Sequence, residues 1–334
     1  MALENPKREI WLDVAKGIGI IAVVLGHTDR PFAQYIYWWH MPLFFALSGY
    51  LFKPVEEAAT LKTWIRKRTI QLGIPYVCFV AVLLAMHYIL VPPVSLHQVT
   101  SDLAGVAAGG RMIPSGLIGI YAPIWFITCL YATQILFVLI AFTWRHTPAR
   151  IAAVLVAYLL AHLESWAMGK YHINIPLDLD VALMCVAYYA FGFFARPLLS
   201  MRYRPRVIAP LSLVLSTGFL IAGINGLFRY VLDLKYVGYH SLLLDLAIPL
   251  TMVVAVCVVS HAVSRLKIAS FFVVLGVASL TIMYLHMYVN QSLSNHFRYG
   301  LLLYTAFGTL IPLLIWWLFL KRFSVTRRFF LGTK

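Results

Sequence analysis

Charged residues are scarce in this 334-residue chain: they make up 12% of it, whereas apolar residues account for 62%. A soluble domain usually carries roughly a quarter of its residues as charged side chains. The chain therefore has too few charges to cover a water-exposed surface, which excludes an ordinary soluble enzyme. Lipid is the expected environment for most of its surface.

Cysteine is also rare, and its placement excludes two kinds of site. The four cysteines all lie within apolar stretches and none forms a CxxC pair; they are Cys78, Cys129, Cys185 and Cys257. Neither a disulfide framework nor a cysteine metal site is indicated by this spacing. We predict that these thiols are small core residues and that the protein uses no metal.

No cleavable signal peptide is evident, because the first apolar run follows Lys7 and Arg8 and continues without a small-residue cleavage site. We interpret that run as the first of about ten transmembrane helices, since helices satisfy their own backbone hydrogen bonds in lipid. The predicted spans cover residues 10–28, 35–52, 70–91, 122–142, 150–166, 181–199, 207–224, 240–261, 270–290 and 300–320. The expected fold is all-α, polytopic and membrane-embedded. We expect a single transmembrane domain over residues 1–334, without an appended soluble domain.

Positive charge is concentrated on one side of these predicted spans. The formal net charge is +15, yet only six of the 27 lysines and arginines fall in loops of the opposite side: Arg30, Arg111, Lys170, Arg229, Lys235 and Arg298. Basic residues accumulate in cytoplasmic loops, so both termini are predicted to be cytoplasmic, and nucleic acid is not an expected partner. Among the outer segments, we expect residues 92–121 to form an irregular loop and residues 164–180 to face water.

The first predicted helix carries three ionisable residues, Asp13, Lys16 and His27. Such residues are costly inside a membrane and indicate function by default. Asp13 and Lys16 are three residues apart and share a helical face. His27 follows Lys16 by eleven residues, close to three full turns and roughly 16 Å along the axis. Lys16 and His27 therefore lie on one face at different depths, although a lysine can also extend along the helix to the inner interface.

Two further histidines fall at the depth of His27. His40 opens the second predicted helix, and His286 lies near the outer end of the ninth. A neutral imidazole can accept a proton near physiological pH, as a general base does. One histidine near a helix end is commonly just an interfacial residue. Three at one depth favour a site.

A basic cluster precedes the third predicted helix and contains Lys62, Arg66, Lys67 and Arg68. It can serve as a topology anchor beside anionic lipid, or as a seat for the phosphates of a cytoplasmic donor, which arginine binds bidentately. The tryptophans near the outer side, Trp38, Trp39 and Trp125, can be interfacial aromatics or can stack on a sugar ring.

Four stretches of the chain resemble the membrane-bound acyltransferase-3 family, which includes O-antigen, exopolysaccharide and nodulation-factor O-acetylases. The first contains Lys16 and His27 with the preceding Leu12 and Asp13. The others are HMPLFFALSGYLF (residues 40–52), RKRTIQLGIPY (66–76) followed by PIWFITCL (123–130), and GVASLTIMYLH (276–286). The second stretch is most similar to the fucose 4-O-acetylase-like branch.

The resemblance implies an O-acyltransferase of the bacterial inner membrane. It would move an acyl group, typically acetyl, from cytoplasmic acetyl-CoA to a sugar hydroxyl of a surface, secreted or lipid-linked glycan. Membrane lipids and polysaccharide synthesis machinery are the other expected partners. The catalytic candidates are His27, His286 and His40. The donor-binding candidates are Lys16, Arg66 and Arg68, and the substrate-binding candidates are Asp13, Trp39, Ser48 and Trp125.

Two alternatives use the same residues differently. In a glycan or small-solute transporter or flippase, Asp13, Lys16 and His27 would serve as a proton relay. Such transporters commonly contain two related halves, and the sequence shows no internal repeat. A structural subunit of a polysaccharide synthase is the second alternative, but it leaves the histidine layer without a role.

Overall fold

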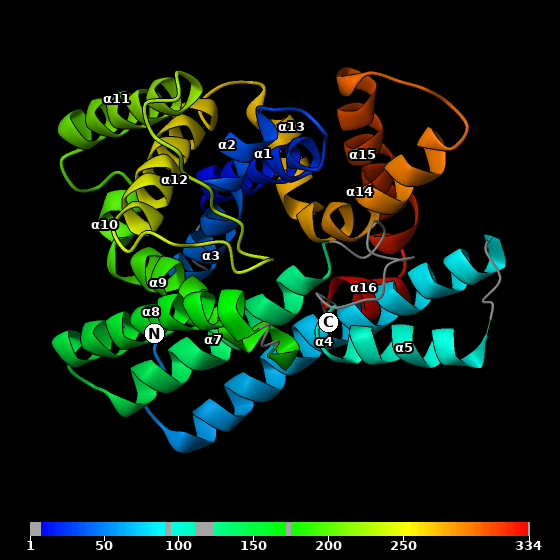
Figure 1. Ribbon diagram of the computed structural model, residues 1–334, viewed down its shortest axis with the longest axis horizontal. Helices are drawn as coiled ribbons and strands as arrows, with labels where there is room; N and C mark the ends of the chain where they lie inside the picture. Colours follow the sequence, from blue (N-terminus) through cyan, green and yellow to red (C-terminus); the bar gives the residue numbers. More distant parts are fainter. Residues whose placement is uncertain (1–7, 91–94, 111–122, 172–174, 333–334) are drawn as a thin grey trace, which may run out of the picture.

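The computed structural model describes residues 8–90, 95–110, 123–171 and 175–332, and every regular element in these ranges is helical. The longer helices are α1 (Ile10–Gly26), α3 (His40–Tyr50), α4 (Ala58–Leu90), α5 (Leu96–Ala107), α7 (Trp125–Thr143), α8 (Thr147–Tyr171), α9 (Leu179–Phe194), α11 (Pro205–Ile224), α12 (Leu244–Val263), α13 (Ala269–Val277), α14 (Ser279–Ser294), α15 (Leu301–Ile315) and α16 (Ser324–Leu331). Short elements are α2 (Ala33–Tyr37), η1 (Pro176–Asp178), α10 (Arg196–Leu199) and η2 (Trp316–Leu320). Figure 1 shows their arrangement.

Seven helices of the described residues are long and apolar enough to cross a membrane, or eight if the bent pair α13 and α14 forms one span. The predicted all-helical, polytopic membrane fold is thus confirmed. The count of ten is not, because two predicted spans are short: α1 has 17 residues and α3 has 11. At about 1.5 Å per residue, α3 alone reaches only half-way across a hydrocarbon core of about 30 Å.

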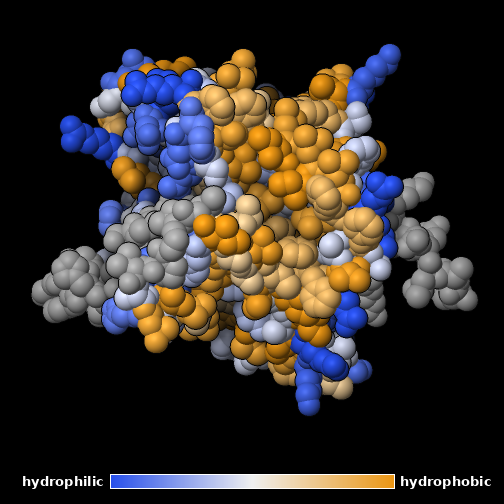
Figure 2. All heavy atoms as spheres, turned by 90° about the vertical axis from the view of Figure 1, so that its right-hand side faces the viewer, coloured by the Kyte–Doolittle hydropathy of each residue, from blue (hydrophilic) through white to orange (hydrophobic). Residues whose placement is uncertain are grey.

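The surface has the distribution that lipid requires. Figure 2 shows a face dominated by apolar residues, with hydrophilic residues gathered toward its margins. Large apolar side chains such as Leu302 and Ile89 are 83% and 78% exposed. In water such exposed apolar side chains would favour aggregation. In a bilayer they are solvated by the lipid tails.

Glycines bring the two helices of the candidate site against their neighbours. A Cβ atom on Gly17 of α1 would overlap the Phe272 carbonyl of α13, and one on Gly276 would overlap the Asp13 carbonyl. Such reciprocal contacts of small residues allow the helix backbones to touch, which is the main way that helices associate tightly in lipid.

The pair α3 and α9 is built in the same way. A Cβ atom on Gly49 would overlap the Tyr189 carbonyl, and one on Gly192 would overlap the Ala46 carbonyl. Because α1 and α3 are fixed by backbone contact, the histidines at their outer ends are held in place by the rigid part of the fold.

Two expectations for the outer segments were wrong. Residues 96–107, placed in an irregular loop, form α5, which Ser95 caps and which Tyr76 and Tyr88 of α4 hold through hydrogen bonds to Val106 and Asp102. The segment 164–180, expected to face water, contains the buried carboxylates of Asp178 and Asp180. These residues are excluded from water because η1 and α9 turn them inward against α7.

Three of the four cysteines are buried, as predicted, and Cys78 is not. Cys129, Cys185 and Cys257 are fully buried, Cys78 is half-buried, and all four thiols are free.

Candidate active site

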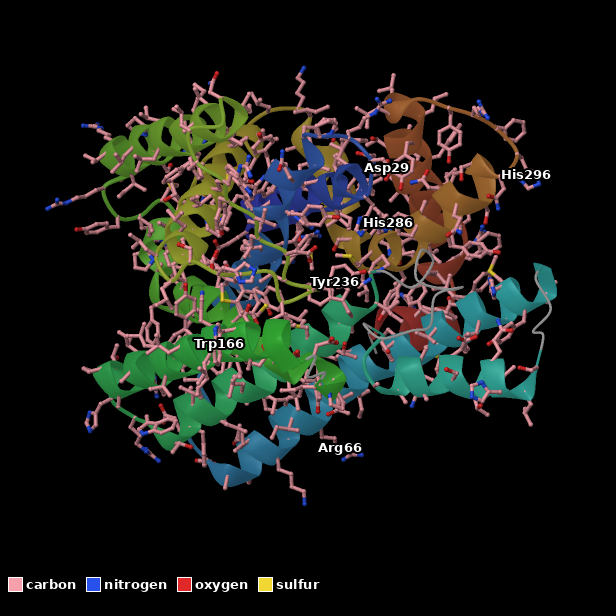
Figure 3. The ribbon with its side chains drawn as sticks, viewed as in Figure 1. Asp29, Arg66, Trp166, Tyr236, His286 and His296 are labelled. Atoms are coloured by element: carbon pink, nitrogen blue, oxygen red, sulfur yellow. The ribbon has the colours of Figure 1, made fainter. Side chains whose placement is uncertain are left out.

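Two histidines from distant parts of the chain meet inside the protein. His286 Nε2 lies 3.4 Å from His27 Nδ1, and the ring centroids are 5.0 Å apart. His27 is the C-cap residue that follows α1, and His286 lies on α14, where it is completely buried. Figure 3 shows His286 in the interior of the molecule. The predicted layer of histidines therefore contains a true contact pair.

Backbone carbonyls determine which nitrogen of each ring carries the proton. The Val23 carbonyl lies 2.8 Å from His27 Nδ1, and the carbonyls of Ile282 and Met283 lie 2.9 and 3.0 Å from His286 Nδ1. A carbonyl only accepts, so Nδ1 of each ring is the donor. The lone pair of His27 Nε2 is then available to take a proton, and His286 Nε2 is a second acceptor beside His27 Nδ1.

The third histidine shares a small cavity with His27. His40 is 2% exposed and its Nδ1 donates to the Ile36 carbonyl at 2.8 Å. The cavity has a volume of about 60 Å³. We call it the outer cavity; its lining includes Trp125 and the segment from Leu232 to Tyr236.

A larger cavity, of about 1010 Å³, opens among the basic segments that the charge pattern places on the inner side. We call it the inner cavity. The basic side chains that line it come from three regions of the chain and are Arg8, Lys16, Lys53, Arg196 and Arg202. Asp13 also lines it, 2.6 Å from Arg8 Nε and 3.5 Å from Lys16 Nζ. The carboxylate of Asp13 thus balances two of the cations and orients Lys16.

The two cavities adjoin at two side chains. Phe126 of α7 and Met283 of α14 line both the inner and the outer cavity. Met283 also supplies a carbonyl that fixes His286. An unbranched, flexible methionine is a side chain that a slender ligand can displace, so only displaceable groups of this kind need to move for the two cavities to join at Met283.

The structure sorts the sequence-predicted residues into three groups. The inner cavity takes Asp13, Lys16 and Ser48, whose Oγ accepts a hydrogen bond from Gln134 at 2.9 Å. The outer cavity takes His27, His40 and Trp125, with His286 behind His27. Neither lining includes the remaining three, Trp39, Arg66 and Arg68.

Arg66 and Arg68 instead lie on the inner part of α4. Arg66 is exposed and points away from the molecule (Figure 3). Arg68 donates to Gln71 at 3.3 Å and stands over the Trp64 ring at 5.4 Å. Trp39 is partly buried and packs against apolar side chains of the core, while its neighbour Trp38 is fully buried.

Sequence reasoning overlooked two groups of lining residues. Arg196 and Arg202 are among the basic residues that the charge pattern assigns to the inner side, but nothing in the sequence shows that their segment lines a cavity. Asp233, Lys235 and Tyr236 of the outer cavity were also missed. A usable signal for Lys235 was present, because basic residues are few on the predicted outer side.

No group of three histidine, cysteine, aspartate or glutamate residues that could hold a metal ion occurs in the ranges that the structure describes.

The helical membrane fold, the histidine pair and the basic cavity together fit a membrane acyltransferase. A family model described as an acyltransferase domain matches residues 9–321, so the chain belongs to the acyltransferase-3 family, as its motifs predicted. The nodulation protein NolL of Sinorhizobium fredii is 32% identical over 142 residues, which cover 39% of this chain and 36% of that protein. NolL of Mesorhizobium japonicum is 29% identical over 143 residues, covering 39% and 35%. The chain thus matches about a third of the length of these relatives. No solved structure matches the chain.

Proposed function

We propose that this protein is an O-acetyltransferase that moves an acetyl group from cytoplasmic acetyl-CoA to a sugar hydroxyl of a glycan or lipid-linked glycan on the outer side of the bacterial inner membrane. The observation that carries the proposal is the meeting of the basic inner cavity with the histidine-lined outer cavity at Phe126 and Met283. Donor and acceptor would enter from opposite sides and react where the cavities adjoin.

The inner cavity suits the donor in both charge and shape. Coenzyme A carries its phosphates at one end and its thioester at the other, joined by a slender arm. Arg202, Arg196 and Lys53 would hold the phosphates, because guanidinium groups bind phosphate oxygens bidentately. The arm would pass Lys16, Ser48 and the apolar side chains of the lining toward Met283. Arg66 and Arg68 lie outside this lining, so we assign them to the membrane surface.

His27 acts as the general base in this proposal. Its Nε2 takes the proton of the acceptor hydroxyl while the hydroxyl oxygen attacks the thioester carbonyl. The new carbon–oxygen bond forms, the carbon–sulfur bond breaks, and the departing thiolate takes the proton back from His27. His286 is a positioning residue, because its Nε2 accepts from His27 Nδ1–H and stabilises the imidazolium.

The other two residues of the outer cavity have simpler roles. The Nε2 of His40 accepts a hydrogen bond from the acceptor, since its Nδ1 is used by Ile36. Trp125, only 6% exposed, forms an apolar wall suited to the face of a sugar ring. Polysaccharide synthesis machinery would supply the glycan, and membrane lipids would surround the protein.

The test uses purified protein in lipid vesicles with acetyl-CoA labelled in its acetyl group. We expect label to move to sugar, and His27→Gln to lower the rate by about 10²-fold or more. His296→Gln is the matched control: His296 is exposed and lies at the edge of the molecule (Figure 3). Full transfer by a correctly inserted His27→Gln protein would remove His27 from its role. Glycan movement across the vesicle membrane without thioester turnover would favour a flippase instead.

A further inference from the structure

The segment that joins α11 to α12 reaches the outer cavity and is held firmly on the way. We call residues 229–243 the acceptor finger; it is the yellow-green trace that runs toward the middle of the molecule in Figure 1. Trp38 Nε1 donates to the Tyr230 carbonyl at 3.2 Å. Ser165 Oγ lies 2.8 Å from the Val237 carbonyl and 3.0 Å from the Tyr239 carbonyl.

The tip of the finger is closed by a pair of backbone bonds. Asp233 N–H donates to the Gly238 carbonyl at 2.9 Å, and Gly238 N–H donates to the Asp233 carbonyl at 2.7 Å. Surface loops are usually more mobile than the elements they connect. These hydrogen bonds instead hold the backbone of residues 233–238 beside the outer cavity.

Side chains alternate along the tip. Leu232 and Leu234 are 1% and 4% exposed and pack against the core, whereas Asp233 and Lys235, which alternate with them, are half-buried. All four line the outer cavity with His27 and His40. Lys235 interacts electrostatically with His27, and its Nζ lies 5.1 Å from the centre of the Tyr236 ring. Burial raises the pKa of the Asp233 carboxyl.

The residues of the tip border the space beside the catalytic candidates. Asp233, Lys235 and Tyr236 line the outer cavity together with His27 and His40. An acceptor whose hydroxyl reaches His27 would therefore lie against them. A carboxylate, an ammonium and an aromatic ring, side by side, are the groups that recognise an uncharged sugar, by accepting from hydroxyls, donating to them and covering a ring face.

We propose that the acceptor finger binds an uncharged hexose of the acceptor glycan and selects which of its hydroxyls reaches His27, through Asp233, Lys235 and Tyr236. This inference rests on the proposed function and adds to it the substrate class and the residues that set specificity.

The test compares methyl glycosides of fucose, glucose, galactose and mannose as acceptors. We expect Asp233→Asn and Lys235→Gln to raise the acceptor KM by about tenfold or more and to change the order of preference among the four sugars. The KM for acetyl-CoA should stay unchanged, because neither residue lines the inner cavity. Asparagine keeps the oxygen that accepts from Tyr236 N–H at 3.3 Å, so the turn is preserved. Arg229→Gln, an exposed residue at the base of the finger, is the control.

Binding of the same glycosides without acetyl-CoA is measured in parallel by calorimetry. Transfer by the wild type with an unaltered acceptor KM and preference in both finger variants would overturn this inference alone. If the wild type transfers no acetyl group, the proposed function fails, and calorimetry still decides the inference: sugar binding that Lys235→Gln abolishes supports it, and binding that is absent or indifferent to both variants overturns it.

Discussion

The Nδ1 of His27 faces the Nε2 of His286 at 3.4 Å while also donating to the carbonyl one turn back in its own helix. The two residues are 259 positions apart in the chain, yet each ring is oriented by a carbonyl of its own segment. The arrangement leaves His27 Nε2 as an acceptor, and in the proposed mechanism this nitrogen reacts while His286 supports it.

Replacing His286 by leucine should therefore slow the reaction without abolishing donor binding. We expect kcat to fall by about tenfold to a hundredfold, because the imidazolium of His27 loses an acceptor and its ring is less well oriented. The KM for acetyl-CoA should be unchanged, since His286 lies outside the inner cavity lining. Steady-state kinetics measure both. An unaltered kcat would show that the pair has no catalytic meaning.

Removing a cation from the inner cavity should weaken donor binding and little else. For Arg202→Gln we expect the KM for acetyl-CoA to rise about tenfold, because the donor loses one charge-assisted hydrogen bond. The KM for acetyl-pantetheine, which lacks the nucleotide phosphates, should not change. Arg145→Gln, exposed between α7 and α8, is the matched control. The variant Arg66→Gln tests the sequence-based hypothesis directly: a larger effect there than at Arg202 would return the phosphate site to α4.

A bulky residue at the junction of the cavities should separate donor binding from transfer. Met283→Trp would fill the place where the thioester passes, so we expect kcat to fall by about tenfold or more while coenzyme A still binds. Equilibrium binding and transfer rate are measured on the same preparation, with the conservative Met283→Leu as control, since a volume-conserving exchange of this kind is well tolerated. Equal rates in the two variants would mean that the donor takes another route.

Helix contact at Gly192 should be essential for stability. A methyl group there collides with the Ala46 backbone of α3, so Gly192→Ala should lower the free energy of unfolding by about 1–3 kcal/mol, the usual cost of overpacking. At Gly218 of α11 an added Cβ meets nothing within 4 Å, and Gly218→Ala should be neutral or slightly stabilising. Thermal unfolding in detergent compares the two. If both variants melt alike, backbone contact does not hold α3 to α9.

Much of the candidate site could be predicted from the sequence because its residues stand out by their spacing within single helices. Lys16 and His27 share one helix, and an ionisable residue in an apolar run is conspicuous whatever surrounds it. His40 and His286 were found for the same reason. The helices themselves followed from hydropathy, although α3 is too short to span the bilayer alone.

What the sequence could not show depends on how helices pack. Arg66 and Arg202 look alike as basic residues beside predicted spans, and only the arrangement of α1, α3 and α10 makes the second a cavity residue. Asp178 looks like a water-facing loop residue, but η1 turns it inward. The position of the acceptor finger could not be predicted from the sequence, because it depends on contacts with Trp38 and Ser165, which lie far away in the chain.

The junction at Phe126 and Met283 has a consequence for how the membrane is crossed. A carrier must expose its site to each side in turn, and it returns empty. In the proposed function, two chambers that share one wall would let only the acetyl group change sides, while coenzyme A and the glycan would each remain in their own compartment. The barrier to ions would then stay closed throughout turnover.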